Sequence, residues 1–536
     1  MAAIQENRAH KENVNPTPWE LEHLTRVPDD INWTIYLVAV AELAERFTYR
    51  SVTAPLQNYV QNAREDPLRP GALNMGQGIA TCISFFYMGW TSLAPVIGAI
   101  VADAWIGRYW TIVLGTGCSW SGSLLIFSTS FPASLDQGAG LPGLLVALFL
   151  LGLGSGGIRS NVAPLIADQY VRKPVQVRTL DNGTKVLIDP DLTIQTIYGR
   201  YYWVVNLGPL AVIPASWLEL KVSFWAAFML PLVFWLLTAA ILIPCRASYS
   251  VQKPRGSVIL QAAQVFWLGL KGGFNLNAAK PSCMAETHSA FAVSWDDKFV
   301  DELRVALVAC TVFCIFPVYW VCYGQMNNSL VSQAAAMETY GVPNDMMSFF
   351  NTIGVLAFIP IMEKALFPAL QRHNIDFKPI SRIAVGFVVI ACAMGYSAGI
   401  QALIYKSPPC YDHPLQGTCS NGGTTPNNVN VFLQIPTFAM LAVTEILSIT
   451  TGMEYAYTKA PKSMRSLAVS LFILMNAIGS ALGIALSPIS KDPSILIEFA
   501  SLSGVMFLTA ILSWVFLDKY NKKEKEMNKL HDVNDG

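Results

Sequence analysis

The sequence predicts an all-α membrane protein with about twelve transmembrane helices in two groups of six. Three observations support this fold class. Of the 536 residues, 53% are hydrophobic and only 13% are charged, which is about half the charged share of a soluble domain. Apolar runs of about 20 residues, long enough to cross a bilayer, recur along the chain. A polar stretch at residues 246–300 interrupts the series halfway.

The expected spans are separated by short polar connections. We place them near residues 33–59, 77–101, 110–130, 142–165, 199–218, 223–244, 302–324, 347–368, 382–405, 431–454, 467–487 and 495–517. The domain organisation that follows is an N-terminal arm (1–32), a first six-helix bundle (33–245), a linker (246–300), a second six-helix bundle (301–518) with a large loop (406–430), and a tail (519–536). Two such bundles joined by a linker are typical of the major facilitator architecture, in which the substrate site lies near the midplane between the halves.

The distribution of basic residues predicts the orientation. Lys and Arg gather in the loop at 172–200 and in the tail at 519–529, both on the side of the N-terminus, while the opposite loops hold few. Basic loops remain in the cytosol, so we expect both termini there. The first apolar run is too long for a cleavable signal peptide. The formal net charge is zero, and we expect no nucleic-acid partner.

Two of the ten cysteines differ from the rest. Cys410 and Cys419 bracket a loop rich in Pro, Gly and Asn on the predicted outer face, where a disulfide can persist. Free thiols are the alternative. Most of the other cysteines lie singly in apolar helices, where we expect them to act as small packing residues.

The first span carries four charges, which is the feature that most needs a functional explanation. Glu42, Glu45, Arg46, Tyr49 and Arg50 follow helical spacing and so share one face. Each ionisable group at membrane depth costs about 2.5–3.5 kcal/mol on insertion scales, so it must face a partner or a cavity. One face of this helix is therefore expected to be wet or paired.

This arrangement favours proton coupling. A glutamate beside an arginine is held ionised, while burial opposes the charge, so Glu42 and Glu45 next to Arg46 can load and release a proton as water access changes. An anionic substrate group on Arg46 would compete with the two glutamates and ease their protonation. The alternative is an inert ion-pair network that locks the first helix.

Polar residues in other spans complete a candidate substrate site. Arg46, Arg50 and Arg159 come from the first bundle and the lone acid Glu445 from the second, which suits a ligand that is negative at one end and positive at the other. Further hydrogen-bonding candidates, for each of which simple packing is the alternative, are Tyr49, Asn206, Gln325 and Asn351.

A short turn after the second span holds Asp103 and Arg108. These residues can pair neighbouring helix ends and contribute to gating; a solvated turn with a structural ion pair is the alternative. None of the six histidines falls within a predicted span, so we expect no intramembrane metal site. With no phosphate-binding loop and no nucleophile–base arrangement, we expect neither ATP drive nor an enzyme.

The motifs resemble those of a known family. Glu-Leu-Ala-Glu-Arg-Phe-Thr-Tyr at 42–49 is similar to the ExxERFxYY signature of the proton-coupled oligopeptide transporters, and further segments match that family at 98–112, 156–170, 202–208 and 434–464. The resemblance covers about 35–515. The long linker and the loop before the tenth helix look most like the fungal members.

The resemblance implies proton-driven import of di- and tripeptides across the plasma membrane. We expect a monomer without a cofactor, in which the proton is the coupling ion. Glu42, Glu45 and Arg46 match the proton-coupling motif. Positions around the peptide carboxylate match Arg46, Tyr49, Arg159 and Asn206, and those around its amino terminus match Asn351 and Glu445.

Several positions depart from the family pattern. Arg50 and Ser51 replace Tyr-Gly, Ser92 stands where a pocket Tyr is usual, Arg159 replaces Lys, and Phe472 stands where many bacterial members have Trp. We therefore expect a preference for more acidic or bulkier substrates. Competing hypotheses are an importer or exporter of a specialised metabolite or organic anion, and a sensor with negligible flux.

Overall fold

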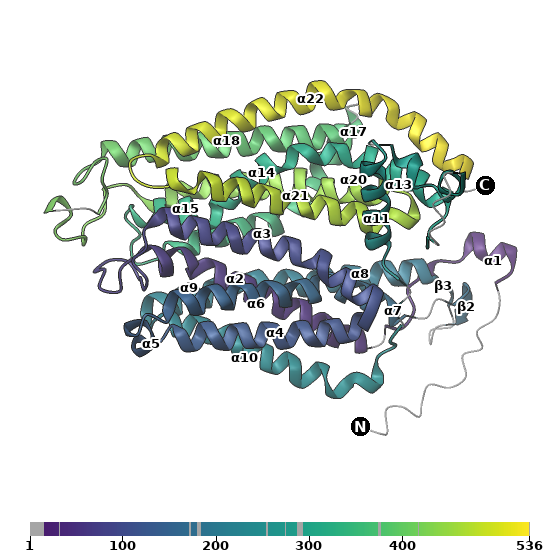
Figure 1. Cartoon of the computed structure of the whole chain (residues 1–536), viewed down its shortest axis with the longest axis horizontal. Helices are drawn as coiled ribbons and strands as arrows, with labels where there is room; N and C mark the ends of the chain where they lie inside the picture. Colours follow the sequence, from purple (N-terminus) through teal and green to yellow (C-terminus); the bar gives the residue numbers. More distant parts are fainter. Residues whose placement is uncertain are drawn as a thin grey trace.

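The structure is a computed structural model, and it describes residues 16–31, 33–170, 173–179, 184–252, 254, 256–273, 275–286, 293–373, 377–415 and 418–534. Figure 1 shows long helices lying side by side, with the short helix α1 (Pro18–His23) and the end of the last helix, α22 (Ile495–Asn534), at the same end. We call this the linker end, because the segments that connect the two halves lie there. The opposite end, where the loop after Lys406 projects, is called the disulfide end.

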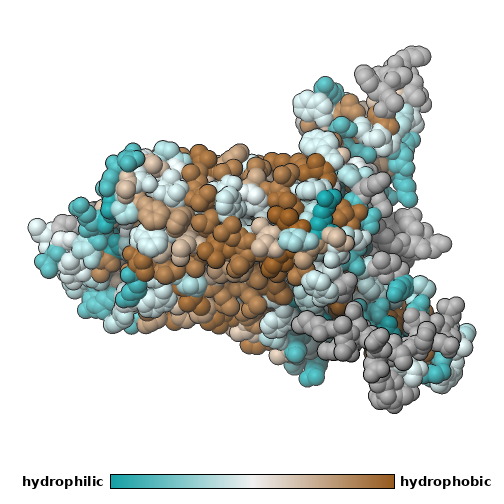
Figure 2. Space-filling view, turned by 90° about the horizontal axis from the view of Figure 1, so that it is seen from below, coloured by the Kyte–Doolittle hydropathy of each residue, from teal (hydrophilic) through white to brown (hydrophobic). Residues whose placement is uncertain are grey.

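Eleven helical segments in the described residues are long and apolar enough to cross a membrane. The helix α2 (Thr34–Gln61) is not among them, although its 28 residues make it about 42 Å long. Its charged residues explain this, because they lower its hydropathy. On the face drawn in Figure 2, hydrophobic surface covers the middle of the molecule and hydrophilic surface lies at both ends. The chain is a multi-pass membrane protein, and the expectation of about twelve spans agrees with eleven segments plus α2.

The first half contains six crossing segments, several of them built from consecutive helices. They are α2, α3 (Gln77–Val101) with the π turn η2 (Ala102–Ile106), α4 (Arg108–Thr129), α6 (Gly140–Arg159) with α7 (Val162–Asp168), α8 (Pro190–Leu207) with η3 (Gly208–Ala211) and α9 (Val212–Lys221), and α10 (Phe224–Leu242), with the short α5 (Pro132–Asp136) between α4 and α6.

The second half repeats this number. Its segments are α13 (Asp297–Cys310), η6 (Thr311–Ile315), α14 (Phe316–Gly324), η7 (Gln325–Asn327) and α15 (Ser329–Ala335); η8 (Asp345–Ser348), α16 (Phe349–Ile361), η9 (Met362–Leu366) and α17 (Phe367–Arg372); α18 (Pro379–Lys406); η11 (Val431–Gln434), α19 (Ile435–Thr444), the π turn η12 (Glu445–Thr450) and α20 (Thr451–Lys459); α21 (Arg465–Leu486) with η14 (Ser487–Ile489); and α22 (Ile495–Asn534). The seventh span is therefore longer than the expected 302–324, and α22 continues into the expected tail.

Close backbone approach holds the helices together. A Cβ atom on Gly98 of α3 would lie 2.2 Å from the carbonyl oxygen of Gly156 on α6, so only glycine fits there. Between the halves, a Cβ atom on Gly483 of α21 would lie 2.6 Å from the Phe85 ring of α3. Small residues at such contacts are typical of membrane helices, where backbone proximity replaces the hydrophobic effect. The pair α3 and α21 therefore forms a seam between the two halves.

The connecting segments lie at the linker end (Figure 1). Between the halves, the chain forms η4 (Pro244–Ser248), α11 (Val258–Lys271), η5 (Leu276–Ala279) and α12 (Pro281–Glu286). Ala262 and Val265 of α11 are buried in one apolar cluster with Val300 and Leu303 of α13 and with Met464. The linker is thus attached to the second half.

A small sheet at the linker end was not expected from the sequence. Its strands β1 (Arg26–Val27), β2 (Gln176–Thr179) and β3 (Lys185–Ile188) are ordered β1-β3-β2, with β1 parallel and β2 antiparallel to β3. Arg26 Nη1 lies 2.9 Å from Asp189 Oδ2, and Arg178 Nη2 lies 2.8 Å from Asp29 Oδ1. Such short strands have no readable hydrophobic period, and their ion pairs join residues far apart in the sequence. The sheet attaches the segment after α1 (Pro18–His23) to the start of α8.

Candidate functional site

The charged stripe of α2 lies inside the first half. Glu42 and Glu45 are 2% and 3% exposed. Arg46 Nε donates to Glu42 Oε1 at 3.3 Å, and its Nη2 is 3.2 Å from the same oxygen. Arg46 Nε also lies 3.7 Å from Glu45 Oε2. The predicted pairing along this face is therefore present, and Arg46 is shared between both acids.

A second arginine reaches Glu45 from α6. Arg159 Nε lies 2.8 Å from Glu45 Oε1, and Ser155 Oγ donates to the same oxygen at 2.6 Å. The Arg159 guanidinium also lies 5.1 Å from the centre of the Tyr49 ring, a cation–π contact. The glycines of α6 let this helix approach its neighbours, which places its last turn beside α2. We name Glu42, Glu45, Arg46, Tyr49 and Arg159 the arginine cluster.

The arginine cluster keeps capacity for both a proton and an anion. One oxygen of each acid, Oε2 of Glu42 and of Glu45, is buried and accepts no hydrogen bond. The Arg46 side chain is 40% exposed, whereas that of Arg159 is 19% exposed. Two arginines balance two glutamates. An incoming carboxylate can therefore contact Arg46 from the open side, while the buried oxygens accept protons.

Two predicted site residues near this cluster, Arg50 and Asn206, make no hydrogen bond or ion pair with it. Arg50, one turn further along α2, is half-buried and makes no hydrogen bond or ion pair within the described residues. Asn206 Nδ2 donates to Tyr202 O of its own helix at 2.7 Å. Its helix nevertheless ends against α2, because a Cβ atom on Gly208 would lie 2.5 Å from Arg46 Cβ. Asn206 is thus near the cluster, but its amide is not directed into it.

The second half contributes a group around a single acid. Glu445 Oε2 accepts hydrogen bonds from Tyr323 OH at 2.8 Å and from Asn351 Nδ2 at 3.2 Å. Glu445 begins the π turn η12, a local widening that is frequent at functional sites. No Lys or Arg of the described residues pairs with it. We name Glu445, Tyr323 and Asn351 the lone-acid cluster. Tyr323 was not among the predicted site residues, although its place in an apolar span with other aromatics was visible.

Gln325 lies elsewhere than expected. Its side chain is 1% exposed, and its Nε2 donates to Glu498 Oε1 at 3.1 Å. Ser329 and Ser490 donate to the same carboxylate at 3.1 and 2.7 Å. In this conformation Gln325 therefore supports a buried acid of α22 and does not face a ligand. Glu498 was missed because it lies alone at the start of an apolar run.

Arg108, in the turn between α3 and α4, has a closer acidic partner than the predicted Asp103. Arg108 Nη1 lies 2.8 Å from Asp168 Oδ2, whereas Arg108 Nε is 4.0 Å from Asp103 Oδ1. Arg108 therefore ties α4 primarily to the end of α7, and the expected contact with Asp103 is secondary. At the other end of the molecule, Cys410 and Cys419 are joined by a disulfide with a Cα–Cα distance of 5.4 Å.

Two positions that depart from the resembled pattern are buried. Ser92 of α3 is 4% exposed and donates to Met88 O at 3.0 Å. Phe472 of α21 is 1% exposed, with its ring centre 5.1 Å from that of Phe313 and 4.9 Å from that of Phe316. Phe472 belongs to the aromatic core of the second half and does not line an open cavity here.

Hydrogen bonds join the two halves near the disulfide end. The side-chain amides of Asn58 and Asn344 form two hydrogen bonds with each other. Each Nδ2 donates to the Oδ1 of the other residue at 3.0 Å. Ser332 Oγ donates to Gln61 Oε1 at 2.6 Å, and Ser216 Oγ donates to Asp345 Oδ2 at 2.5 Å. Two further contacts join the halves here: Gln57 Nε2 lies 3.3 Å from Ser332 Oγ, and the carboxyl group of Glu219 contacts that of Asp345. We call this set the seal.

Beyond the seal, towards the linker end, the facing surfaces are accessible. Tyr202 of α8 is 53% exposed, and it interacts electrostatically with Glu445 and Glu363 of the second half and with Arg46 of the first. Tyr457 of α20 is also 53% exposed. The seal therefore separates the two clusters from the disulfide end, and on the linker side of the seal Tyr202 and Arg46 are exposed.

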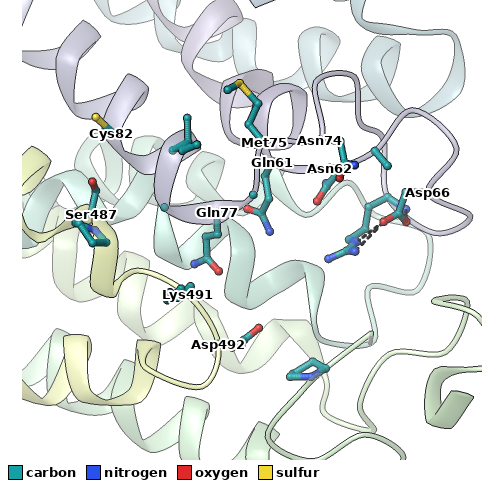
Figure 3. A pocket seen from close by; sticks show the side chains of 17 residues that line it. Gln61, Asn62, Asp66, Asn74, Met75, Gln77, Cys82, Ser487, Lys491 and Asp492 are labelled. Atoms are coloured by element: carbon teal, nitrogen blue, oxygen red, sulfur yellow. Dashed lines mark hydrogen bonds and ion pairs between the residues drawn. The ribbon is translucent and has the colours of Figure 1, made fainter. Parts of the chain in front are cut away.

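A cavity lies on the other side of the seal. It encloses about 710 Å³ between the α2–α3 connection and the segment after α21, and Figure 3 shows Gln61, Gln77, Lys491 and Asp492 pointing into it. The ion pair between Arg69 and Asp66 (2.7 Å) lies at its wall. No predicted site residue lines this cavity. It is a vestibule at the disulfide end.

Comparisons with known proteins agree on one family. Residues 109–503 match the POT family. A probable peptide transporter of Schizosaccharomyces pombe is 40% identical over 96% of this chain and 82% of that protein. A peptide transporter of Saccharomyces cerevisiae is 38% identical over 96% of this chain and 83% of that protein.

A solved structure supports the fold. The crystal structure of the POT family transporter PepTSo superimposes with a TM-score of 0.71 at 19% identity, covering 92% of this chain and 99% of the other. The motif around α2 lies outside the matched range 109–503, so it adds separate support. By its matched range, its full-length relatives and its twelve-helix arrangement, this chain belongs to the POT family.

Proposed function

We propose that this protein is a proton-coupled symporter that imports di- and tripeptides or peptide-like substrates by alternating access. The observation that carries the proposal is the separation of charge: an arginine cluster in the first half and a lone acid in the second, on the same open side of the seal. Relatives named as peptide transporters support the substrate class.

A short peptide is complementary to this arrangement. Its carboxylate can form charge-assisted hydrogen bonds with Arg46, which is exposed, and with Arg159 behind it. Its amino group can contact Glu445, whose bonds from Tyr323 and Asn351 fix the carboxylate in place. A ligand that contacts both halves stabilises the conformation in which they are close together, as alternating access requires.

The proton is proposed to act through Glu42 and Glu45, and no other cofactor is invoked. In the empty state Arg46 pairs with both acids, and Arg159 supplies the second positive charge. A substrate carboxylate competes for Arg46, and the weakened pairing favours protonation of a buried glutamate. Binding of the substrate and uptake of a proton are therefore coupled. The substrate carboxylate binds Arg46 more tightly when a glutamate is protonated, and the glutamate binds a proton more tightly when the carboxylate is on Arg46.

We infer that the linker end faces the cytosol, because the basic segments lie there. The conformation would then be open to the cytosol and sealed outside. A plasma-membrane location and a monomeric state complete the proposal. A sensor without flux is less favoured, since a receptor has no need for buried acids with free oxygens.

The test is uptake of a labelled dipeptide into proteoliposomes with an imposed pH gradient. Wild-type protein is expected to accumulate peptide only when the outside is acidic. Glu45→Gln should abolish accumulation but retain exchange of external for internal peptide. Glu454→Gln, on an exposed position of α20, is the matched control and should behave as wild type. Accumulation that ignores the pH gradient would contradict the proposal.

A further inference from the structure

The seal contains two acids that the proposed mechanism does not use. Glu219 lies at the end of α9 in the first half, and Asp345 begins η8 in the second half. They are 3% and 1% exposed. Each belongs to a different half, so their contact exists only while the disulfide end is closed.

Donors satisfy only part of this pair. Asn58 Nδ2 donates to Glu219 Oε1 at 2.8 Å, and Ser216 Oγ donates to Asp345 Oδ2 at 2.5 Å. Glu219 Oε2 and Asp345 Oδ1 are buried and receive no hydrogen bond from a donor. The two carboxyl groups are placed to hydrogen-bond each other. Ionised carboxylates are acceptors only, so this bond requires a proton on one of them.

No cation compensates the pair. The groups around it are the amides of Asn58 on α2 and Asn344 before η8 and the hydroxyl of Ser216 on α9. The nearest basic residue along α9, Lys221, extends instead over the Trp217 ring, 5.8 Å from its centre. No Lys or Arg in the described part of the chain pairs with either acid. Two buried carboxylates in contact cannot both stay charged.

Glu498 shows the alternative treatment of a buried acid. Its carboxylate accepts bonds from Gln325, Ser329 and Ser490, and all three partners lie in the same half. These three donors favour the charged form of Glu498 and offset part of the effect of its burial. The pair in the seal differs from Glu498 in two ways. Its two carboxyl groups contact each other as well as the donors Asn58, Ser216 and the backbone amides of Asp345 and Met346, and the pair is divided between the halves.

We propose that Glu219 and Asp345 form a second proton-binding site, which holds one shared proton while the disulfide end is sealed and releases it when the halves part there. The site is separate from the arginine cluster. The inference rests on the proposed alternating access, since it requires that the seal opens.

The sealed and open conformations bind different numbers of protons, and this decides which of them acidification favours. When the halves part, both carboxyl groups meet water and ionise at neutral pH, since free Asp and Glu titrate near 4. The sealed conformation therefore binds one more proton than the open one. Acidification favours the sealed state, by up to about tenfold in the ratio of sealed to open molecules per pH unit.

The experiment follows the distance across the seal. Two fluorophores are attached through non-natural amino acids at Glu65 and Tyr340, which are exposed at the disulfide end of the first and second half. Energy transfer in full-length protein in lipid nanodiscs is measured between pH 5 and 8 without peptide. We expect the wild-type population to move to the short distance as the pH falls.

Variants assign the effect. Asp345→Asn supplies a permanent amide donor, so the seal should stay closed with no pH dependence. Glu219→Gln should do the same and serves if the first variant does not fold. Glu498→Gln, at a buried acid outside both clusters and the seal, should retain the wild-type slope. A wild-type distance that does not change with pH, or a slope retained in both seal variants, overturns the inference.

The two proposals fail separately. Peptide accumulation that ignores the pH gradient, together with a seal that titrates, would reject proton-coupled uptake and keep the second site. Coupled uptake with a seal that does not titrate would do the reverse.

Discussion

The arginine cluster and the lone-acid cluster stabilise buried carboxylates in opposite ways. In the first half, two buried acids are balanced by Arg46 and Arg159 through ion pairs. In the second half, Glu445 has only the neutral donors Tyr323 and Asn351. A balanced cluster is stable without ligand but depends on every member. A lone acid held by neutral donors can be replaced by a neutral side chain without leaving a buried charge unpaired. While it is ionised, its negative charge can bind a cationic group of a ligand.

The largest effect is expected from breaking the balanced cluster. Arg159→Met leaves Glu45 buried without its closest cation, and removal of one partner from a buried pair costs about 3–5 kcal/mol. We expect uptake to fall at least about 100-fold, with a lower unfolding temperature in detergent. Arg159→Lys retains the charge and should recover most of the stability. Near-normal stability of Arg159→Met would mean that the pair is not buried in the membrane.

Neutralising the lone acid should act on binding and leave the fold intact. In Glu445→Gln the amide oxygen can still accept bonds from Tyr323 and Asn351, so the unfolding temperature should stay close to that of wild type. A charge-assisted bond to the peptide amino group contributes about 1.5–3 kcal/mol, so KM should rise about 10- to 100-fold. Inhibition of uptake by N-acetylated peptides should not change. An equal loss for acetylated and free peptides would contradict the assignment of the amino-group site.

Arg50 extends the first cluster with a cation that no acid balances. It should favour acidic side chains on the substrate, but a half-exposed pair contributes at most about 1 kcal/mol. We expect acidic dipeptides to compete up to about fivefold better than neutral ones, and Arg50→Tyr to remove the difference. Competition against a labelled neutral dipeptide measures this. Equal competition in wild type would discard the predicted preference.

The smallest effect is expected far from both clusters, at the sheet of the linker end. Burial raises the pKa of Asp189, but the bond from Arg26 and the amides of Asp191 and Leu192 outweigh it and lower the pKa below its usual value. This contribution is complete above the unfolded pKa near 4 and is lost as the pH falls through the folded value. Asp189→Ala should cost about 0.5–2 kcal/mol, as for other N-caps. Faster hydrogen exchange at β1 and the first turn of α8, with uptake unchanged, is the expected result.

Local patterns were sufficient for much of this molecule. Hydrophobic length predicted the spans, and helical spacing predicted that Glu42, Glu45 and Arg46 share one face, because both depend on the residues of one helix. The need of Arg159 for a partner also followed from its place in a membrane segment. The motif resemblance then identified the family, which the comparisons confirm.

Partner choice between helices was decided by tertiary packing. Arg108 pairs chiefly with Asp168, Gln325 supports Glu498, and Glu219 meets Asp345 across the two halves. These residues lie far apart in the sequence, and their contact depends on how the helices are placed and on which end is closed. The amino-acid sequence by itself determined the number of helices, the charged face of α2 and the family. Only the tertiary structure decided which buried charges are neutralised by a neighbour, because that depends on distances in space and not on spacing along one helix.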